Sequence, residues 1–284
     1  MMKKIITFLF CTTLLISCRK EKSLDRTGGD PNAVFLGNNC KLSQILNVDT
    51  NTNTGWEAHN IFFNSSGLPV RSEVYDSIGL APYADDIYTY KGDTVFVNGN
   101  SSYFIKNSSG RMVLFRGPED PTDPLSEDID ITYTYNAAGY LTKASYAYTA
   151  LPASPLLQST YSYTGNNLTK ARTEVLVPSP ELVIDADLSY SSQTVRDFIY
   201  TFPDAFYYVN HLPALNFGNK SANALSKVTT RYYNAGIAVD SAVTNYSKFK
   251  LSNDGYVLQF YADGDWQDGM GIYYEMTRFK YFCK

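Results

Sequence analysis

The sequence predicts an all-β protein: an antiparallel meander of consecutive hairpins that forms a large twisted or curled sheet, with very little helix. Tyrosine and phenylalanine are abundant, with 24 Tyr and 16 Phe but only 2 Trp, and aromatic residues favour half-buried strands. A phrase also recurs in which apolar residues lead into a short turn ending in Gly and then into a second alternating segment. No long stretch carries apolar residues at helical spacing between good caps.

The first 17 residues predict a signal peptide. Lys3 and Lys4 supply the positive start, and residues 5–16 form an uncharged apolar stretch. That stretch is too short for a stable membrane span, which needs about 20 residues.

The end of this segment indicates a lipid anchor. Leu15, Ile16, Ser17 and Cys18 resemble the lipobox of bacterial lipoproteins. The resemblance implies that the thiol of Cys18 receives a diacylglycerol and that the chain is cut before it, so that acyl chains hold the protein on the membrane. The alternative is a plain secretory signal that happens to end in a cysteine.

The expected location is therefore the outer membrane, as a lipoprotein. Acid-rich residues directly after the cysteine can direct Bacteroidetes lipoproteins to the cell surface, but residues 19–22 contain one acid among three bases. Whether the protein occupies the periplasmic or the cell-surface face stays open.

The mature chain is expected to have two parts. Residues 18–39 are polar and contain RTGGDPN, which predicts a flexible tether from the lipidated Cys18. Residues 40–284 are expected to form a single β-rich domain. The formal net charge of −4 and the lack of a long basic block make nucleic acid an unlikely partner.

The copies of the recurring phrase indicate where each hairpin lies along the chain. Its copies are IFFNSSGLPVRSEVY from Ile61, YFIKNSSGRMVLF from Tyr103, YTYNAAGYLTKASYAY from Tyr133 and YSYTGNNLTKARTEV from Tyr161, with weaker copies from Arg231 and Phe249. The glycine of each strong copy falls where a tight turn needs positive φ, which glycine adopts at little cost.

These copies resemble YD and RHS-type repeats, whose phrase runs Tyr-x-Tyr-Asp-x-x-Gly-Arg-Leu. The nearest copy is Tyr133 to Thr142, in which Asn136 replaces the Asp and Tyr140 replaces the Arg. A closer resemblance is to uncharacterised Bacteroidetes-type lipoproteins that combine a lipobox, degenerate YD-like hairpins and a cysteine near the C-terminus. The resemblance implies a β meander and an envelope address, and it supplies no activity.

Two cysteines remain once Cys11, in the signal, and Cys18 are set aside. Cys40 and Cys283 lie at opposite ends of the folded region in an exported, oxidising setting. We expect them to form a disulfide between the first and last strands, the alternative being two free buried thiols.

No catalytic motif is present, and the sequence predicts a non-enzymatic protein. The two histidines, His59 and His211, lack metal-ligand spacing, and no phosphate loop, dinucleotide fingerprint or nucleophile elbow occurs. The expected function is an envelope-anchored lipoprotein whose non-catalytic β domain binds a glycan, a peptide or a partner protein. The alternatives are a carboxylate-dependent hydrolase and a purely structural component of an envelope complex.

Aromatic side chains are the candidate ligand-binding groups. Trp56, Tyr207, Tyr208 and Trp266 could stack on sugar rings, although most such rings serve as cross-strand pairs.

One acidic turn is a weak candidate for a metal site, and no other cofactor is expected. Asp263, Asp265 and Asp268 alternate on a short loop, and Ca²⁺ prefers carboxylate oxygens. The EF-hand pattern fails here, and a solvated hairpin tip is the simpler interpretation.

Overall fold

The structure is a computed structural model that describes residues 36–37, 39–99, 101–120, 123, 125–203, 212–265 and 275–283. These residues form sixteen strands and contain no helix, hence no helix that could cross a membrane. The strands are β1 (Cys40–Asp49), β2 (Thr54–Phe63), β3 (Pro69–Tyr75), β4 (Ala84–Lys91), β5 (Thr94–Val97), β6 (Ser102–Lys106), β7 (Met112–Pro118), β8 (Asp128–Tyr135), β9 (Leu141–Tyr148), β10 (Leu157–Thr164), β11 (Asn167–Val175), β12 (Glu181–Thr194), β13 (Asn223–Asn234), β14 (Ile237–Leu251), β15 (Val257–Gly264) and β16 (Glu275–Cys283).

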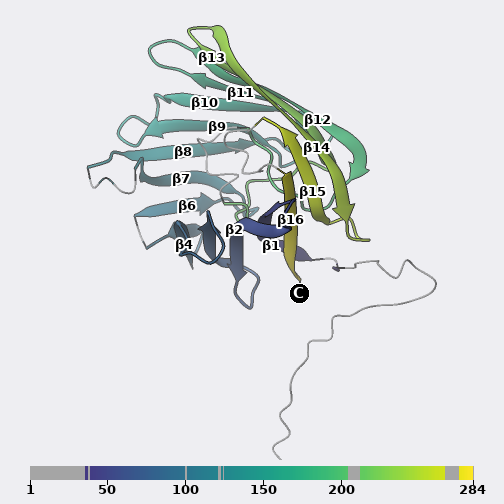
Figure 1. Ribbon diagram of the computed structural model, residues 1–284. Coiled ribbons are helices and arrows are strands. Elements are labelled where there is room, and N and C mark those ends of the chain that lie inside the picture. The colour runs from purple at the N-terminus through teal and green to yellow at the C-terminus, as the bar shows by residue number, and fades with distance from the viewer. Residues whose placement is uncertain are drawn as a thin grey trace, which may run out of the picture.

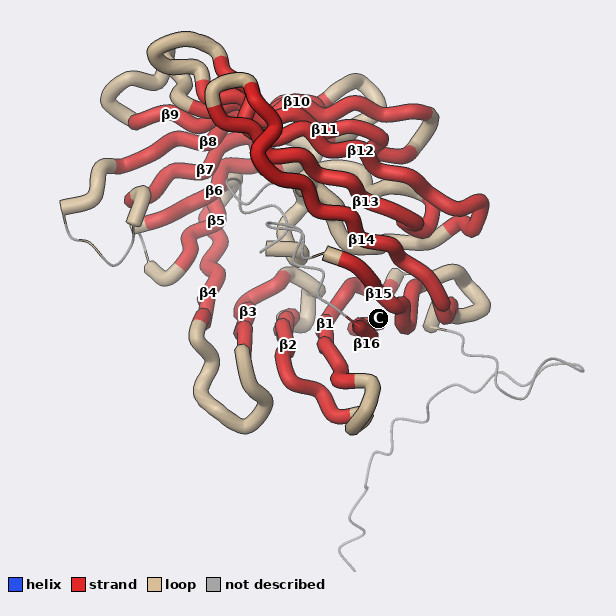
Figure 2. Tube along the Cα trace, turned by 45° about the horizontal axis from the view of Figure 1, so that its top comes forward, coloured by secondary structure: helices blue, strands red, loops and turns tan. Residues whose placement is uncertain are grey.

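The strands follow one another in chain order around a closed antiparallel barrel (Figures 1 and 2). Pairing of β1 with β16 closes it, from Cys40 opposite Cys283 to Val48 opposite Met276. The open twisted or curled sheet expected from the sequence is therefore wrong, although the all-β character is confirmed. Cys40 and Cys283 in the closing pair are 243 residues apart in the sequence. No local turn pattern therefore indicates that these two strands pair.

The barrel has two unlike ends, because antiparallel neighbours send successive connections to opposite ends. The terminus end, where β1 begins and β16 finishes, carries the turns 64–68, 92–93, 107–111, 136–140, 165–166 and 252–256, together with the connector, residues 195–222 between β12 and β13. The loop end carries connections 50–53, 76–83, 98–101, 119–127, 149–156, 176–180, 235–236 and 265–274.

The glycine turns of the four strong copies, and that of the weaker copy from Phe249, lie at the terminus end, whereas the weaker copy from Arg231 turns at the loop end. Their positive φ is confirmed for Gly67, Gly110, Gly139, Gly165 and Gly255. The strong copies form the hairpins β2–β3, β6–β7, β8–β9 and β10–β11, so the same kind of turn recurs at the same end of the barrel.

One band of the outer wall, which runs from β8 to β14, is polar. One row of cross-strand neighbours runs from β8 to β14 with no apolar residue and no buried member: Thr134, Lys143, Thr160, Arg172, Asp185, Arg231 and Ser241. Side chains alternate between the faces of a strand. The residues that precede or follow members of this row, such as Tyr133 and Ala171, belong to the buried core, so the row itself faces outward.

Ion pairs reinforce this outward face. Arg116 on β7 holds Asp130 on β8 through two hydrogen bonds of 2.7 Å. On β11 to β13, Lys170 lies 3.1 Å from the carboxylate of Asp187, and Arg231 lies 2.8 Å from the same carboxylate. The hydrogen bond from Arg231 lowers the pKa of Asp187. Charged side chains on this face thus pair with one another.

The interior of the barrel is mainly apolar. A neighbouring row that faces inward consists of Tyr161, Ala171, Ala186, Thr230 and Ala242, all of them buried. Several members are small, so this part of the wall leaves room that other residues occupy.

The connector fills that room. Its buried phenylalanines contact separate parts of the wall, with centroid distances of 4.6 Å for Phe202–Tyr161 of β10, 5.2 Å for Phe217–Tyr133 of β8 and 5.9 Å for Phe198–Phe279 of β16. Both described parts of the connector, 195–203 and 212–222, contribute to the same core cluster as the strands. The barrel is therefore packed by its own chain.

Buried tyrosines make the fold sensitive to alkali. Burial raises the pKa of a set of phenols well above the ordinary value of 10.0, namely those of Tyr88, Tyr90, Tyr135, Tyr163, Tyr200, Tyr246 and Tyr281. The unfolded chain releases these protons near pH 10 while the folded chain retains them. Their contribution to stability is therefore complete below about pH 10 and is lost as the pH rises toward the folded-state pKa values.

We expect the thermal unfolding midpoint, followed by circular dichroism, to hold from about pH 8 to about pH 9 and to fall steeply above about pH 10. A midpoint that stays constant up to about pH 11 would contradict the burial of these hydroxyls.

Candidate functional site

A cavity of about 600 Å³ opens at the terminus end of the barrel. It lies between the start of β1, the end of β2, the turn before β9 and the connector. The residues that line it are Lys41, Leu42, Phe63, Tyr140, Val195, Arg196, Asp197, Tyr200, Pro213, Ala214, Leu215, Asn216, Gly218, Asn219, Lys220, Ser221 and Ala222. Its volume is in the range of small-molecule sites in proteins.

Backbone hydrogen bonds fix the connector at the mouth of the barrel. Its two ends meet where Val195 N–H donates to the carbonyl of Ala222, at 2.8 Å. The adjacent Arg196 N–H donates to Gly255 O, also at 2.8 Å, and Asn219 N–H donates to Gly139 O at 2.9 Å. The walls of the cavity are thus held by two of the glycine turns.

Gly218 allows the closest of these approaches. Its φ is +95°, and a Cβ there would lie 2.6 Å from the carbonyl oxygen of Gly139. Gly218→Ala is expected to lower the free energy of unfolding by about 2–3 kcal/mol, because strain and a clash with backbone combine. Gly165→Ala is the matched control: its φ is +58° with nothing within 4 Å of the new Cβ, so a loss of about 1 kcal/mol is expected. Equal losses in urea unfolding would contradict the close packing at Gly218.

Tyr200 organises the floor of the cavity. Its hydroxyl accepts a hydrogen bond from Phe217 N–H at 2.8 Å and lies 3.3 Å from the carbonyl oxygens of Leu215 and Gly218. Burial raises its pKa strongly. The phenol therefore stays neutral and ties the turn 215–218 together.

The charged lining is mostly basic. Lys220 forms an ion pair with Asp197 at 2.8 Å, and its ammonium lies 5.1 Å from the centroid of the Tyr200 ring. The guanidinium of Arg196 lies 5.2 Å from the Tyr256 centroid. Lys41 donates to the carbonyl of Gly67 at 2.8 Å. Aromatic faces and a carbonyl thus position three cations, one of which pairs with the single carboxylate of the lining.

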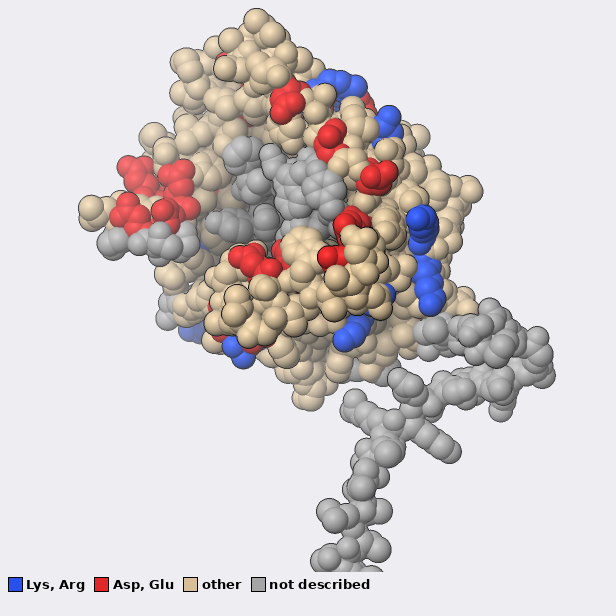
Figure 3. Space-filling view, in the orientation of Figure 1, with Lys and Arg blue, Asp and Glu red and all other residues tan. Residues whose placement is uncertain are grey.

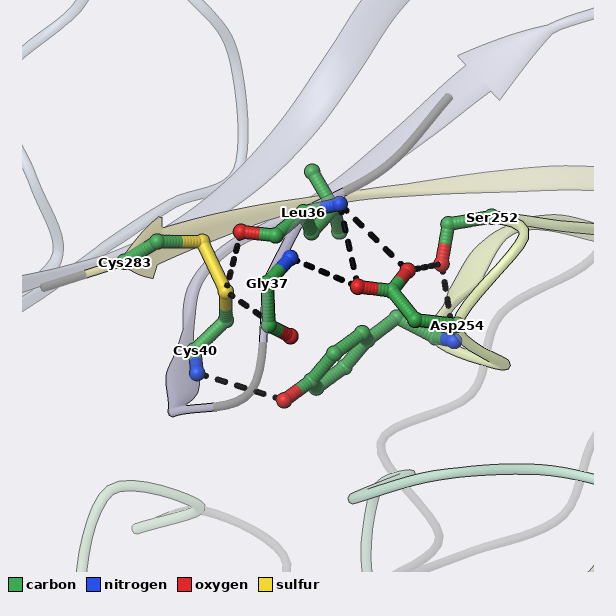
Figure 4. The surroundings of a disulfide bond; sticks show 7 residues. Leu36, Gly37, Cys40, Ser252, Asp254 and Cys283 are labelled. Atoms are coloured by element: carbon green, nitrogen blue, oxygen red, sulfur yellow. Dashed lines mark hydrogen bonds between the residues drawn. A yellow bond between two sulfur atoms is a disulfide. The ribbon is translucent and has the colours of Figure 1, made fainter. Parts of the chain in front are cut away.

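The predicted disulfide is confirmed, and it lies at the terminus end. Cys40 and Cys283 are bonded and join β1 to β16 (Figure 4). Next to it the carboxylate of Asp254 accepts a hydrogen bond of 2.6 Å from Gly37 N–H, and Ser252 Oγ donates to the same carboxylate at 2.6 Å. The first described residues of the chain are thus attached to the β14–β15 turn.

Among the candidate sugar-stacking residues, the structure describes Trp56, which does not line this cavity. Trp56 lies near the loop end, on β2, and is 39% exposed. Tyr207, Tyr208 and Trp266 lie outside the described residues, and the aromatic platform stays a prediction.

The candidate calcium turn is described only in part. Asp263 lies near the end of β15, and the Asp265 carboxylate accepts a hydrogen bond from Val243 N–H at 2.8 Å. Asp268, like Cys18, lies outside the described residues. Among those that are described, no group of three or more His, Cys, Asp or Glu side chains could hold a metal ion.

His59 points into the barrel, in register with Ile45 of the core. Its Nε2 is 2.5 Å from Ser72 Oγ on β3. The buried Glu57 accepts a hydrogen bond from Asn47 Nδ2 at 3.2 Å, and Thr277 Oγ1 donates to Asn47 at 3.1 Å. A strip of hydrogen-bonded polar side chains therefore lines the wall where β16, β1, β2 and β3 meet.

Sequence reasoning missed Lys41, Arg196 and Lys220. They stand in the unrelated phrases NCKLS, VRDFI and GNKSA, and only the folded connector brings two of them to the start of β1. The one signal was the unusual length of the interval between the strands that precede and follow residues 195–222.

Two solved structures share the architecture. A porin-like protein from Bacteroides uniformis has a TM-score of 0.59 at 13% identity, and the alignment covers 85% of this chain and 98% of that one. A porin-like protein from Bacteroides vulgatus has a TM-score of 0.50 at 12% identity, with 86% and 99% covered. Structural similarity at such low sequence identity establishes the fold alone. No protein-family profile and no curated protein matches the sequence.

Proposed function

We propose that the protein is a lipid-anchored, non-catalytic β-barrel of the bacterial cell envelope, which stands beside the membrane and binds a ligand at its terminus end. The polarity of the barrel carries this proposal. A barrel that spans a membrane needs an outward apolar band. Here the outward row contains Lys143, Arg172, Asp185 and Arg231, and the interior is mainly apolar and packed by the connector.

The cost of placing this wall in lipid is large. A lysine or arginine on the lipid face costs about 2–4 kcal/mol at the bilayer midplane. The row between β9 and β13 would bring three such residues, and its ion pairs with Asp185 and Asp187 lie on the same face. This surface is therefore suited to water, and the acyl chains on Cys18 would attach the protein to the membrane.

The proposal also explains where the tether begins. β1 starts at the terminus end, so residues 18–39 would connect that end of the barrel to the acyl chains on Cys18. A flexible segment of this length reaches roughly 25 Å on average. The terminus end would then be the one nearest the membrane. The origin of both structural neighbours in Bacteroides is consistent with the Bacteroidetes-type address.

Two rival functions are less well supported. A glycosidase would place two carboxylates roughly 5 to 9.5 Å apart in one cleft, whereas the described lining of the cavity contains one, Asp197, in an ion pair with Lys220. A structural component that adds strands to a partner needs an open sheet edge, and the described strands close on themselves.

Metabolic labelling with palmitate tests the anchor. We expect the wild-type protein to incorporate the label and Cys18→Ala to lose it, with Cys11→Ala as the matched control that retains it. Absence of label in the wild-type protein, or label that persists in Cys18→Ala, would overturn the lipoprotein proposal.

A further inference from the structure

The described side chains that line the terminus-end cavity carry more positive than negative charge. They include Lys41, Arg196 and Lys220 against a single carboxylate, Asp197. This excess occurs in a chain whose formal net charge is −4. A cavity with this balance favours an anionic ligand.

Specific contacts hold the ammonium groups of Lys220 and Lys41 in place. The Lys220 side chain is 12% exposed, and Asp197 and the Tyr200 ring hold its ammonium. Among the described residues, the ammonium of Lys41 donates one hydrogen bond, to Gly67 O. An ammonium has three donors, so it can bind an oxyanion without losing this bond.

The charges at the two ends of the barrel differ in a way that also favours an anionic ligand at the terminus end. At the terminus end, the turns, the connector and the adjoining strand ends include the basic residues Lys41, Lys91, Lys106, Arg111, Arg196, Lys220 and Lys250 among the described part of the chain, against Asp93, Asp197 and Asp254. At the loop end, the connections and the two nearest residues of each adjoining strand contain acids and neither lysine nor arginine. In Figure 3, acidic side chains gather on the face shown, whereas lysine and arginine lie toward its edges.

We propose that the cavity binds the phosphate of an anionic ligand, a class that includes phospholipid headgroups. Lysine and arginine are the usual protein partners of phosphate, and a volume of about 600 Å³ can hold a headgroup-sized molecule. The inference rests on the proposed function, because a tether that leaves from the same end turns the cavity toward the membrane. The basic rim would draw anionic ligands toward it.

The test uses the mature chain with Cys18→Ala, exported behind a cleavable signal, so that no acyl chain contributes to binding. Glycerol 3-phosphate, titrated calorimetrically at low salt, is the soluble probe. Vesicles of phosphatidylcholine with and without phosphatidylglycerol are the membrane probe. The cavity variant is Lys41→Gln with Lys220→Gln. The control is Lys91→Gln with Lys250→Gln, which removes the same charge from the same rim but outside the cavity lining.

We expect glycerol 3-phosphate to bind, the cavity variant to weaken this binding about tenfold or more, and the control to change it by less than about twofold. Binding of both probes, each weakened by the cavity variant, supports a lipid headgroup as the source of the phosphate. Binding of glycerol 3-phosphate without vesicle binding supports a soluble phosphate compound in the same cavity.

Two results would overturn the inference. One is no glycerol 3-phosphate binding by a chain that circular dichroism shows to be folded. The other is an equal loss of vesicle binding in both variants, since that would reflect diffuse attraction by the rim. Neither result would alter palmitate labelling at Cys18, so the anchor and the cavity are tested separately.

Discussion

Phe217→Ala is expected to lower the free energy of unfolding by about 3–5 kcal/mol. Phe217 is fully buried in the connector, and its ring lies 5.2 Å from that of Tyr133 and 5.9 Å from those of Phe104 and Tyr200, centroid to centroid. Truncation removes these contacts and leaves a cavity between the connector and β6 to β8. Urea unfolding followed by tyrosine fluorescence measures the loss as a lower midpoint.

Phe62→Ala is the matched control for this variant. Phe62 is 43% exposed on the outward face of β2, where Arg71 lies 6.0 Å from its ring centroid. We expect a loss of less than about 1 kcal/mol. If the two substitutions destabilised the protein equally, Phe217 could not be packed inside the barrel, and the connector would not be the filling of its interior.

Removal of the disulfide is the second large effect. The double variant Cys40→Ser with Cys283→Ser is expected to lose about 2–5 kcal/mol, because the bond closes a loop of 243 residues and restricts the unfolded chain. It also stands at one end of the β1–β16 seam, whose pairing closes the barrel. The measurement is urea unfolding in the absence of reductant.

Reductant provides the internal control. It should shift the unfolding midpoint of the parent chain toward that of the double variant and leave the double variant unchanged. A parent chain whose midpoint is insensitive to reductant while its thiols become reactive would contradict a stabilising role for the bond.

The hairpins were predictable because their signals are local. The turn glycines, such as Gly110 and Gly139, and the alternating residues beside them lie within a few positions of one another, and their positive φ follows from the turn. The Cys40–Cys283 bond was predictable for a different reason: only two cysteines remain for an exported chain to pair.

Closure of the sheet and the filling of its interior were not predictable in this way. Segments 198–202 and 212–217 are as apolar as strands, yet they pack inside the barrel because the inward side chains of β11 and β12 include Ala171 and Ala186 and leave space. The cavity depends on that placement, since Arg196 and Lys220 come near Lys41 only once the connector is folded inward.

The proposed function requires that the barrel wall faces water and that only an acyl anchor holds the protein at the membrane. The most direct measurement expresses the mature chain with Cys18→Ala behind a cleavable signal and separates cell fractions by flotation after an alkaline wash. We expect a folded, β-rich protein in the soluble fraction without detergent. A folded protein that floats with the membranes and leaves them only in detergent would contradict it, because the wall itself would then be in lipid.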